Sequence, residues 1–200
     1  MNRKNKKWLS KLNIFKSLVM GALLVCDTSF IQAESLKDQE QMMQHILNEW
    51  NELHLKNDRC KMHFPSEPEH VSEKVNMGGE EGFDLNYDAY ISAMDKQGVY
   101  MLLVAKYPEF VDESYAHTSL EGFLNGMMKN NPTHQLIFAD LLLFEGHEAL
   151  DFFIRNGSVY FKGRALMVKN HLYLIALECE MQHYDEHSFN AFVSSFKLAK

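Results

Sequence analysis

The fold is decided by residues 147–180, which read HEALDFFIRNGSVYFKGRALMVKNHLYLIALECE. Aromatic and aliphatic side chains dominate this stretch, and turn residues interrupt it twice. Asn156-Gly157 is the strongest short hairpin signal that a sequence offers. Lys169-Asn170 or Asn170-His171 marks the second turn. The stretch therefore predicts three consecutive antiparallel strands.

The first of these turns also predicts a register. If Asn156 and Gly157 form a two-residue loop, Phe153 faces Tyr160 and Asp151 lies opposite Lys162. Opposite charges that face each other across two strands are favourable. We therefore expect Asp151 and Lys162 to form a pair.

Helical spacing appears on both sides of these strands. Residues 114–129 carry apolar side chains at steps of three and four, and Pro132 follows shortly after them. Between this helix and residue 147, residues 135–144 predict another strand. A last helix is expected from Asp185, a good N-cap residue. Its predicted inward-facing side chains are Phe189, Phe192, Val193 and Phe196.

The first half of the domain has period-two patterns. We expect strands over residues 60–64, 71–77, 83–94 and 99–107. The total is an antiparallel sheet of about seven or eight strands, and helices must cover its faces. The predicted fold class is therefore α+β, with a single domain over residues 59–200.

A further amphipathic helix is predicted over residues 34–58, ahead of the domain. Trp50 lies on its apolar face together with Ile46, Leu47 and Leu53. This face could pack on the domain or bind a partner, and Trp50 is a candidate partner-binding residue.

Residues 1–33 have the order of a secretory signal peptide. A basic segment that ends at Lys16 precedes an uncharged apolar run over residues 17–26, and Ala33 is a small residue suited to cleavage. The run has about ten residues, whereas a membrane-spanning helix needs about 20. We predict a periplasmic or secreted chain. Two alternatives stay open, namely acylation of Cys26, which would place the protein on a membrane, and a retained amphipathic anchor.

The charge of the mature chain argues against nucleic acid as a partner. Residues 1–33 hold six of the 20 basic side chains and one of the 27 acidic ones, so the remainder has 14 basic and 26 acidic side chains and a formal charge of −12. Such a surface repels phosphate backbones. The expected partner is an envelope or extracellular protein.

The predicted order of elements resembles the PsbP-like fold, over residues 60–198. The resemblance is carried by Phe64-Pro65-Ser66-Glu67-Pro68 at the start, by Gly163-Arg164 before a strand that leads to Leu172-Tyr173-Leu174, and by Ser195-Phe196-Lys197-Leu198 near the end. It implies an α/β/α sandwich and a binding or assembly role without established catalysis. No metal or partner motif of that family is matched here.

The search for catalytic motifs supports no specific enzyme. The sequence lacks G-x-S-x-G, G-x-x-x-x-G-K-[ST] and H-E-x-x-H, and no cofactor is predicted. His183 and His187 are four residues apart, a spacing that on a helix directs two imidazoles at one ion, and Glu145 and His147 could add ligands. Alternatively, these four residues are solvated polar side chains, or the histidines respond to pH.

Three further features bear on function. Cys60 and Cys179 could form one disulfide in an oxidising compartment, or could remain two buried thiols. Tyr87 and Tyr90 point to opposite faces of one predicted strand, so one of them could be available to a partner. The sequence favours an exported, non-catalytic protein-binding module. The alternatives are a metal-binding protein or metal-dependent enzyme, and a carrier of a small apolar ligand between the sheet and the Met-rich helix over residues 114–129.

Overall fold

The computed structural model describes residues 28–55, 59–76, 83–94 and 98–199. Most of the predicted signal peptide, including Cys26, lies outside these ranges. The chain divides into two compact units, residues 1–37 and 38–200, and both sheets belong to the second unit. In the described ranges, no helix combines the length and apolar character needed to span a membrane.

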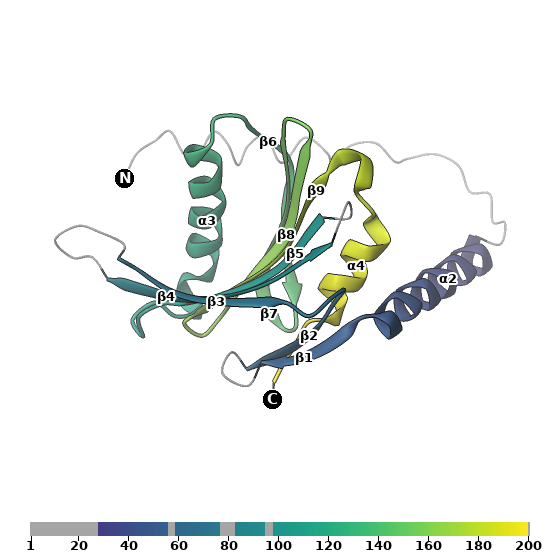
Figure 1. The fold of residues 1–200 in the computed structure, drawn as a ribbon, viewed down its shortest axis with the longest axis horizontal. Coiled ribbons are helices and arrows are strands. Elements are labelled where there is room, and N and C mark those ends of the chain that lie inside the picture. Colours follow the sequence, from purple (N-terminus) through teal and green to yellow (C-terminus); the bar gives the residue numbers. More distant parts are fainter. Residues whose placement is uncertain (1–27, 56–58, 77–82, 95–97, 200) are drawn as a thin grey trace. The chain divides into compact units, whose positions relative to one another are not determined.

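The described elements are helices and antiparallel strands, as expected of an α+β fold (Figure 1). They are α2 (Thr28–Glu49), β1 (Asn51–Leu55), β2 (Cys60–Phe64), β3 (Glu69–Asn76), β4 (Asp84–Met94), β5 (Gly98–Lys106), α3 (Ala116–Asn130), β6 (His134–Phe144), β7 (His147–Asn156), β8 (Val159–Val168), β9 (His171–Glu180), α4 (Glu186–Ser195) and β10 (Lys197–Leu198), with short 3-10 turns at Glu113–Tyr115 and Met181–His183.

Seven strands form one antiparallel sheet in the order β3-β4-β5-β9-β8-β7-β6, and β1, β2 and β10 form a second, smaller sheet. Helix α3 covers one face of the large sheet and α4 covers the other (Figure 1). Successive side chains of a strand point to opposite faces, so β9 supplies Leu174 to the α3 side and Ile175 to the α4 side. This arrangement confirms the predicted α/β/α sandwich.

The last helix agrees closely with its sequence signals. Asp185 is its N-cap residue, and its carboxylate accepts hydrogen bonds from the backbone N–H groups of His187 and Ser188. Phe189 and Phe192 are buried against the large sheet. A side-chain cap of this kind satisfies backbone donors that the helix itself leaves unpaired.

The helix predicted over residues 34–58 is shorter than expected at its C-terminal end. Helix α2 ends at Glu49, and residues 51–55 form β1, which pairs with β2. Leu53 and Leu55 fit a period of two as well as a helical face, and their pairing with Met62 and Cys60 resolves the ambiguity in favour of a strand. The element nearest the domain is therefore part of the small sheet.

The register predicted for the β7–β8 hairpin is wrong by two residues. Asn156 pairs with Val159, so Gly157 and Ser158 form the turn. Gly157 has a φ of 61° and occupies the first central position, which is the glycine position of a type II′ turn. As a result Asp151 lies opposite Arg164, and Lys162 lies opposite Phe153.

Gly163 in β8 provides a test of the packing between β7 and β9. A Cβ atom at this position would lie 2.6 Å from Cζ of Phe152 and 3.1 Å from the carbonyl oxygen of Ile175. Gly163→Ala is therefore expected to lower the free energy of unfolding by about 1–3 kcal/mol through overpacking, measured by urea denaturation.

Gly122 in α3 is the matched control. A Cβ atom there would contact nothing within 4 Å, so Gly122→Ala should raise stability by up to about 1 kcal/mol through helix propensity. Equal effects of the two substitutions would contradict the packing described for Gly163.

Candidate functional site

A pocket of about 700 Å³ lies between α4 and the β6–β8 side of the large sheet. Its lining combines aromatic rings with paired charges. The lining residues are Gln39, Met43, Phe138, Asp151, Phe153, Lys162, Arg164, Glu186, His187, Phe189, Asn190, Val193 and Ser194. Pockets that bind small molecules are of this size and usually combine apolar walls with a few placed polar groups.

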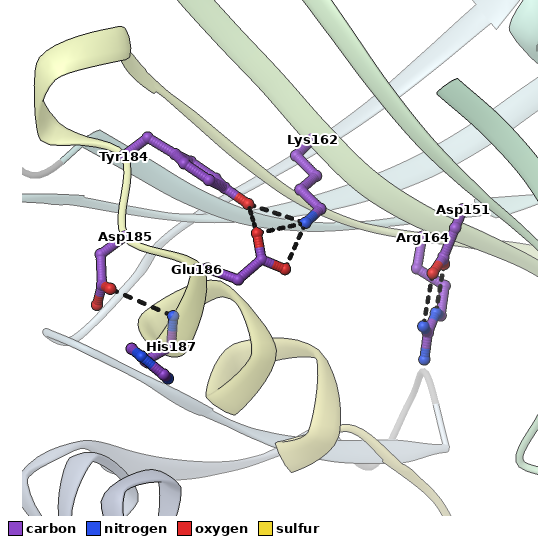
Figure 2. A network of polar contacts seen from close by, with 7 residues as sticks. All are labelled: Asp151, Lys162, Arg164, Tyr184, Asp185, Glu186 and His187. Carbon is purple, nitrogen blue, oxygen red and sulfur yellow. Dashed lines mark hydrogen bonds and ion pairs between the residues drawn. The ribbon is translucent and has the colours of Figure 1, made fainter. Parts of the chain in front are cut away.

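Lys162 of β8 is the buried cation of the pocket, with only 8% of its surface exposed. Its Nζ donates hydrogen bonds to Oε1 of Glu186 at 2.7 Å, to Oε2 of Glu186 at 2.8 Å and to the hydroxyl oxygen of Tyr184 at 2.8 Å (Figure 2). The Tyr184 hydroxyl in turn donates to Glu186. An ammonium group has three donors, so these partners account for every N–H group of Lys162.

Aromatic rings surround the same ammonium group. The rings of Phe189, Phe153, Tyr184 and Phe138 have their centroids at 4.6, 5.3, 5.5 and 5.9 Å from Nζ of Lys162. Cations at such distances are attracted by the ring quadrupole. The rings and the carboxylate together explain how an ammonium group is accommodated inside the fold.

Arg164 is the second cation, two residues further along β8 on the same face. Its Nε and Nη2 donate to the two carboxylate oxygens of Asp151 at 2.5 and 2.7 Å. The guanidinium also stacks over Phe144, with 4.5 Å between the guanidinium carbon and the ring centroid. A bidentate pair of this kind fixes both the position and the plane of the guanidinium.

The pKa values of the pocket follow from these contacts. Burial acts to raise the pKa of Glu186, but the hydrogen bonds from Lys162 and Tyr184 outweigh it and hold that pKa below its ordinary value of 4.5. Burial, together with the hydrogen bond to Glu186, raises the pKa of Tyr184 well above its usual range. The carboxylate of Glu186 and the neutral phenol of Tyr184 are therefore the stable forms at neutral pH.

The charged groups of the pocket are paired with one another. Each carboxylate is already held by a cation, and the ammonium of Lys162 has no free donor or lone pair to offer a substrate. Besides aromatic surface and the part of Arg164 that Asp151 does not occupy, the pocket presents the polar side chains of Gln39, His187, Asn190 and Ser194.

Of the four predicted metal ligands, Glu145 and His147 line one cavity together, His187 lines the pocket beside α4, and His183 lines neither. His183 lies 3.8 Å from Glu180, and His187 lies at the start of α4. Glu145 forms an ion pair with Lys197 at 2.9 Å, and His147 lies 3.5 Å from Glu113. Within the part of the chain that the structure describes, no group of three or more His, Cys, Asp or Glu residues is placed to hold a metal ion.

The aromatic candidates for partner binding are committed to contacts within the fold. Trp50 packs edge-on against Tyr100 and Phe192. Tyr90 is buried and stacks on His70, and the hydroxyl of Tyr87 donates to Glu73 at 2.5 Å. Partner binding by these three residues stays a prediction without added support.

Cys60 and Cys179 are present as two buried thiols of the same hydrophobic cluster. Burial raises the pKa of Cys179 to about 11, which keeps it protonated and unreactive at neutral pH. A disulfide between Cys60 and Cys179 in an oxidising compartment stays a prediction.

Sequence reasoning singled out His187 as a metal-ligand candidate and paired Asp151 with Lys162, but it did not bring the residues of the pocket together. Lys162 and Arg164 are two residues apart in β8, and Asp151 and Phe153 are two residues apart in β7. Residues two apart in a strand share a face, and this spacing is the signal that could have placed each pair on one face of the sheet. Glu186 had no such signal, because its contact with Lys162 joins a strand to a helix 24 residues away.

The fold is similar to the solution structure of cyanobacterial PsbP from Synechocystis sp. PCC 6803, with a TM-score of 0.54 and 13% identity, over 75% of this chain and 92% of that chain. A Pseudomonas aeruginosa protein of unknown function matches with a TM-score of 0.33 and 12% identity, over 67% of this chain and 85% of that one. A scan against family models and a search of curated proteins found no match. The first likeness establishes a PsbP-like fold, as the sequence predicted.

Removing either partner of the Lys162–Glu186 ion pair should lower the free energy of unfolding, but by unequal amounts. Glu186→Gln leaves the buried ammonium without its counter-charge and is expected to cost about 2–3 kcal/mol. Lys162→Met should cost only about 1 kcal/mol, because the side chain of Glu186 is 50% exposed and water can solvate it. Urea denaturation at pH 7 measures both values. A greater destabilisation by Lys162→Met than by Glu186→Gln would contradict this picture.

The same pair predicts a pH dependence. The folded pKa of Glu186 lies below its ordinary value of 4.5, so the stabilisation is complete above about pH 4.5 and is lost as the pH falls through the folded pKa. The stability difference between the wild type and Glu186→Gln should therefore be constant from pH 7 to pH 5 and shrink below that. A difference that stays constant down to pH 2.5 would show that the carboxylate charge is not the cause.

Proposed function

We propose that this chain is an exported, non-catalytic binding module that engages a protein partner through β6, one edge of its large sheet. The observation that carries the proposal is the character of β6. It has 11 residues, and β7 is the one strand that pairs with it in the described ranges. An edge strand presents a row of unpaired backbone N–H and C=O groups, which is a template for pairing with another chain.

Large apolar side chains are exposed along this edge. Leu143 is 77% exposed, and Ile137, Phe138 and Leu141 are also exposed. After His134 at its start, Asp140 is the one acidic or basic residue of the strand. Exposed apolar side chains gathered on one edge are typical of protein–protein contact sites, and a partner strand that added to β6 would bury both these side chains and the open backbone groups.

The opposite edge of the sheet, β3, also exposes Val71 and Val75, but its charged side chains support assigning the interaction to β6. Strand β3 carries charged side chains that are paired across to β4. Lys74 lies 2.6 Å from Asp84, and His70 lies 2.8 Å from Asp88. Charged edge strands discourage pairing with another chain. The two edges thus differ in the way expected if one of them is used for binding.

Charge and leader support the remaining parts of the proposal. The leader predicted over residues 1–33 supports export. The formal charge of −12 that remains after residue 33 favours a partner with a basic or neutral surface and disfavours nucleic acid. The absence of a catalytic motif in the sequence and the mutual pairing of the pocket charges support a role without turnover.

Site-specific photo-crosslinking in the native cell tests the proposed edge. A photoreactive amino acid in place of Leu143 is expected to give a discrete adduct with one protein, identified by mass spectrometry, because this side chain would lie in the interface. Asp140→Lys combined with Leu141→Lys in the same chain should reduce the adduct at least about tenfold, since a basic partner would be repelled and position 141 would no longer offer an apolar side chain.

Phe110 is the matched control position, because it is 70% exposed and lies outside the strands. The same photoreactive group at this position should give no discrete adduct. Adducts of equal yield from both positions would contradict the β6 edge. An adduct found in the cytosol on a chain that retains residue 1 would contradict export.

A further inference from the structure

Arg164 has more hydrogen-bonding capacity than the fold uses. A guanidinium group carries five N–H groups, and Asp151 accepts from one on Nε and one on Nη2. The two N–H groups of Nη1 and the second one of Nη2 have no hydrogen-bond partner among the described residues. The side chain is nevertheless only 19% exposed and lies in the wall of the pocket.

The unused donors form a defined geometry. Asp151 occupies the edge made by Nε and Nη2, so the edge made by Nη1 and Nη2 is left, and Figure 2 shows the remaining nitrogen of Arg164 pointing away from Asp151. The bidentate pair with Asp151 fixes the guanidinium plane, and the ring centroid of Phe144 lies 4.5 Å from the guanidinium carbon. Two parallel N–H groups on a fixed plane match the two oxygens of a carboxylate.

The rest of the pocket is suited to an apolar body. Phe138, Phe153, Met43 and Val193 line it together with Arg164. Its volume of about 700 Å³ is within the range of pockets that bind small molecules. A ligand that placed a carboxylate on Arg164 would therefore have aromatic and aliphatic surface available to the remainder of the molecule.

The charges of the lining limit the charge of the ligand. The charges of Lys162 and Arg164 are balanced by those of Glu186 and Asp151, and His187 also lines the pocket. Asp140 of β6 lies opposite Asp151 in the register, which disfavours a second negative charge. A cationic ligand would have to compete with Lys162 and Arg164 for carboxylates that are already bonded. A monoanion on the unused edge of Arg164 displaces nothing.

We propose that this pocket binds a small amphipathic monocarboxylate, whose carboxylate accepts hydrogen bonds from Nη1 and Nη2 of Arg164 and whose apolar body packs against Phe138 and Phe153. This inference rests on the pocket and does not depend on the protein partner proposed for β6.

Isothermal titration of the purified chain at pH 7.5 tests the proposal with three probes that share one apolar chain: octanoate, octanamide and octylamine. Octanoate is expected to bind at least about tenfold more tightly than octanamide, because a carboxylate offers a charged acceptor oxygen to each of the two N–H groups, whereas an amide offers one neutral oxygen and an NH2 group that cannot accept. Octylamine should bind more weakly than octanamide.

Two variants locate the binding. Arg164→Gln combined with Asp151→Asn removes both charges without leaving Asp151 unpaired, and the preference for octanoate over octanamide should fall below about twofold. Ser194→Phe narrows the pocket from an exposed position of α4 and leaves the Arg164–Asp151 pair intact. It should raise the dissociation constant of octanoate about tenfold.

Lys169→Gln is the control variant. It removes a cation that lies outside this pocket and should leave the dissociation constant of octanoate unchanged.

The proposal is overturned if octanoate shows no saturable binding, if octanamide or octylamine binds as tightly as octanoate, or if Ser194→Phe leaves octanoate binding unchanged. A preference for octanoate that survives in the double variant would also overturn it. If the double variant does not fold, as judged by circular dichroism, the probe series on the wild type and Ser194→Phe still decides the question.

Discussion

Strand β9 has to bury both of its faces, and the arrangement of the other elements follows from this constraint. Its side chains alternate between the two hydrophobic clusters of the sandwich. Leu172, Leu174 and Ala176 belong to the cluster under α3, and Tyr173, Ile175, Leu177 and Cys179 belong to the cluster under α4. A strand that is apolar on both faces is stable only between two covering layers. The order of the seven-stranded sheet places β9 near its middle, where a helix can cover it on each side.

Towards β6, helix α4 no longer covers the sheet completely, and charged side chains replace apolar ones on this face. Strand β8 is adjacent to β9, and it carries Lys162 and Arg164 towards the α4 side. Charged groups in such a place require partners, because leaving them unpaired costs several kcal/mol. Glu186 in the first turn of α4 and Asp151 in β7 supply these partners. The polar network is therefore a consequence of how α4 covers this end of the sheet.

Both proposed binding surfaces lie at the β6 side of the sheet, and Phe138 belongs to both. The edge of β6 offers open backbone groups and apolar side chains, which suit an extended protein segment. The pocket beside it is open to solvent and has paired charges in its lining, and it has a guanidinium edge that suits a small anion. Neither surface requires a catalytic group, so the contacts that stabilise the fold also define what the molecule can bind.

The sequence alone determined those features that depend on near neighbours. The alternation of β7 to β9, the helical spacing of α3 and the cap at Asp185 all act over a few residues, so periodicity and turn chemistry predicted them, together with the α+β class and its resemblance to the PsbP-like fold. Tertiary structure decided the rest. Residues 51–55 form a strand because they pair with β2. Gly157 occupies the first position of the β7–β8 turn, so the register differs by two residues from that of an Asn156-Gly157 turn. Lys162 pairs with Glu186, which lies on a different element. The pocket depends on that register and on the packing of α4, and these are long-range contacts that no local pattern of residues encodes.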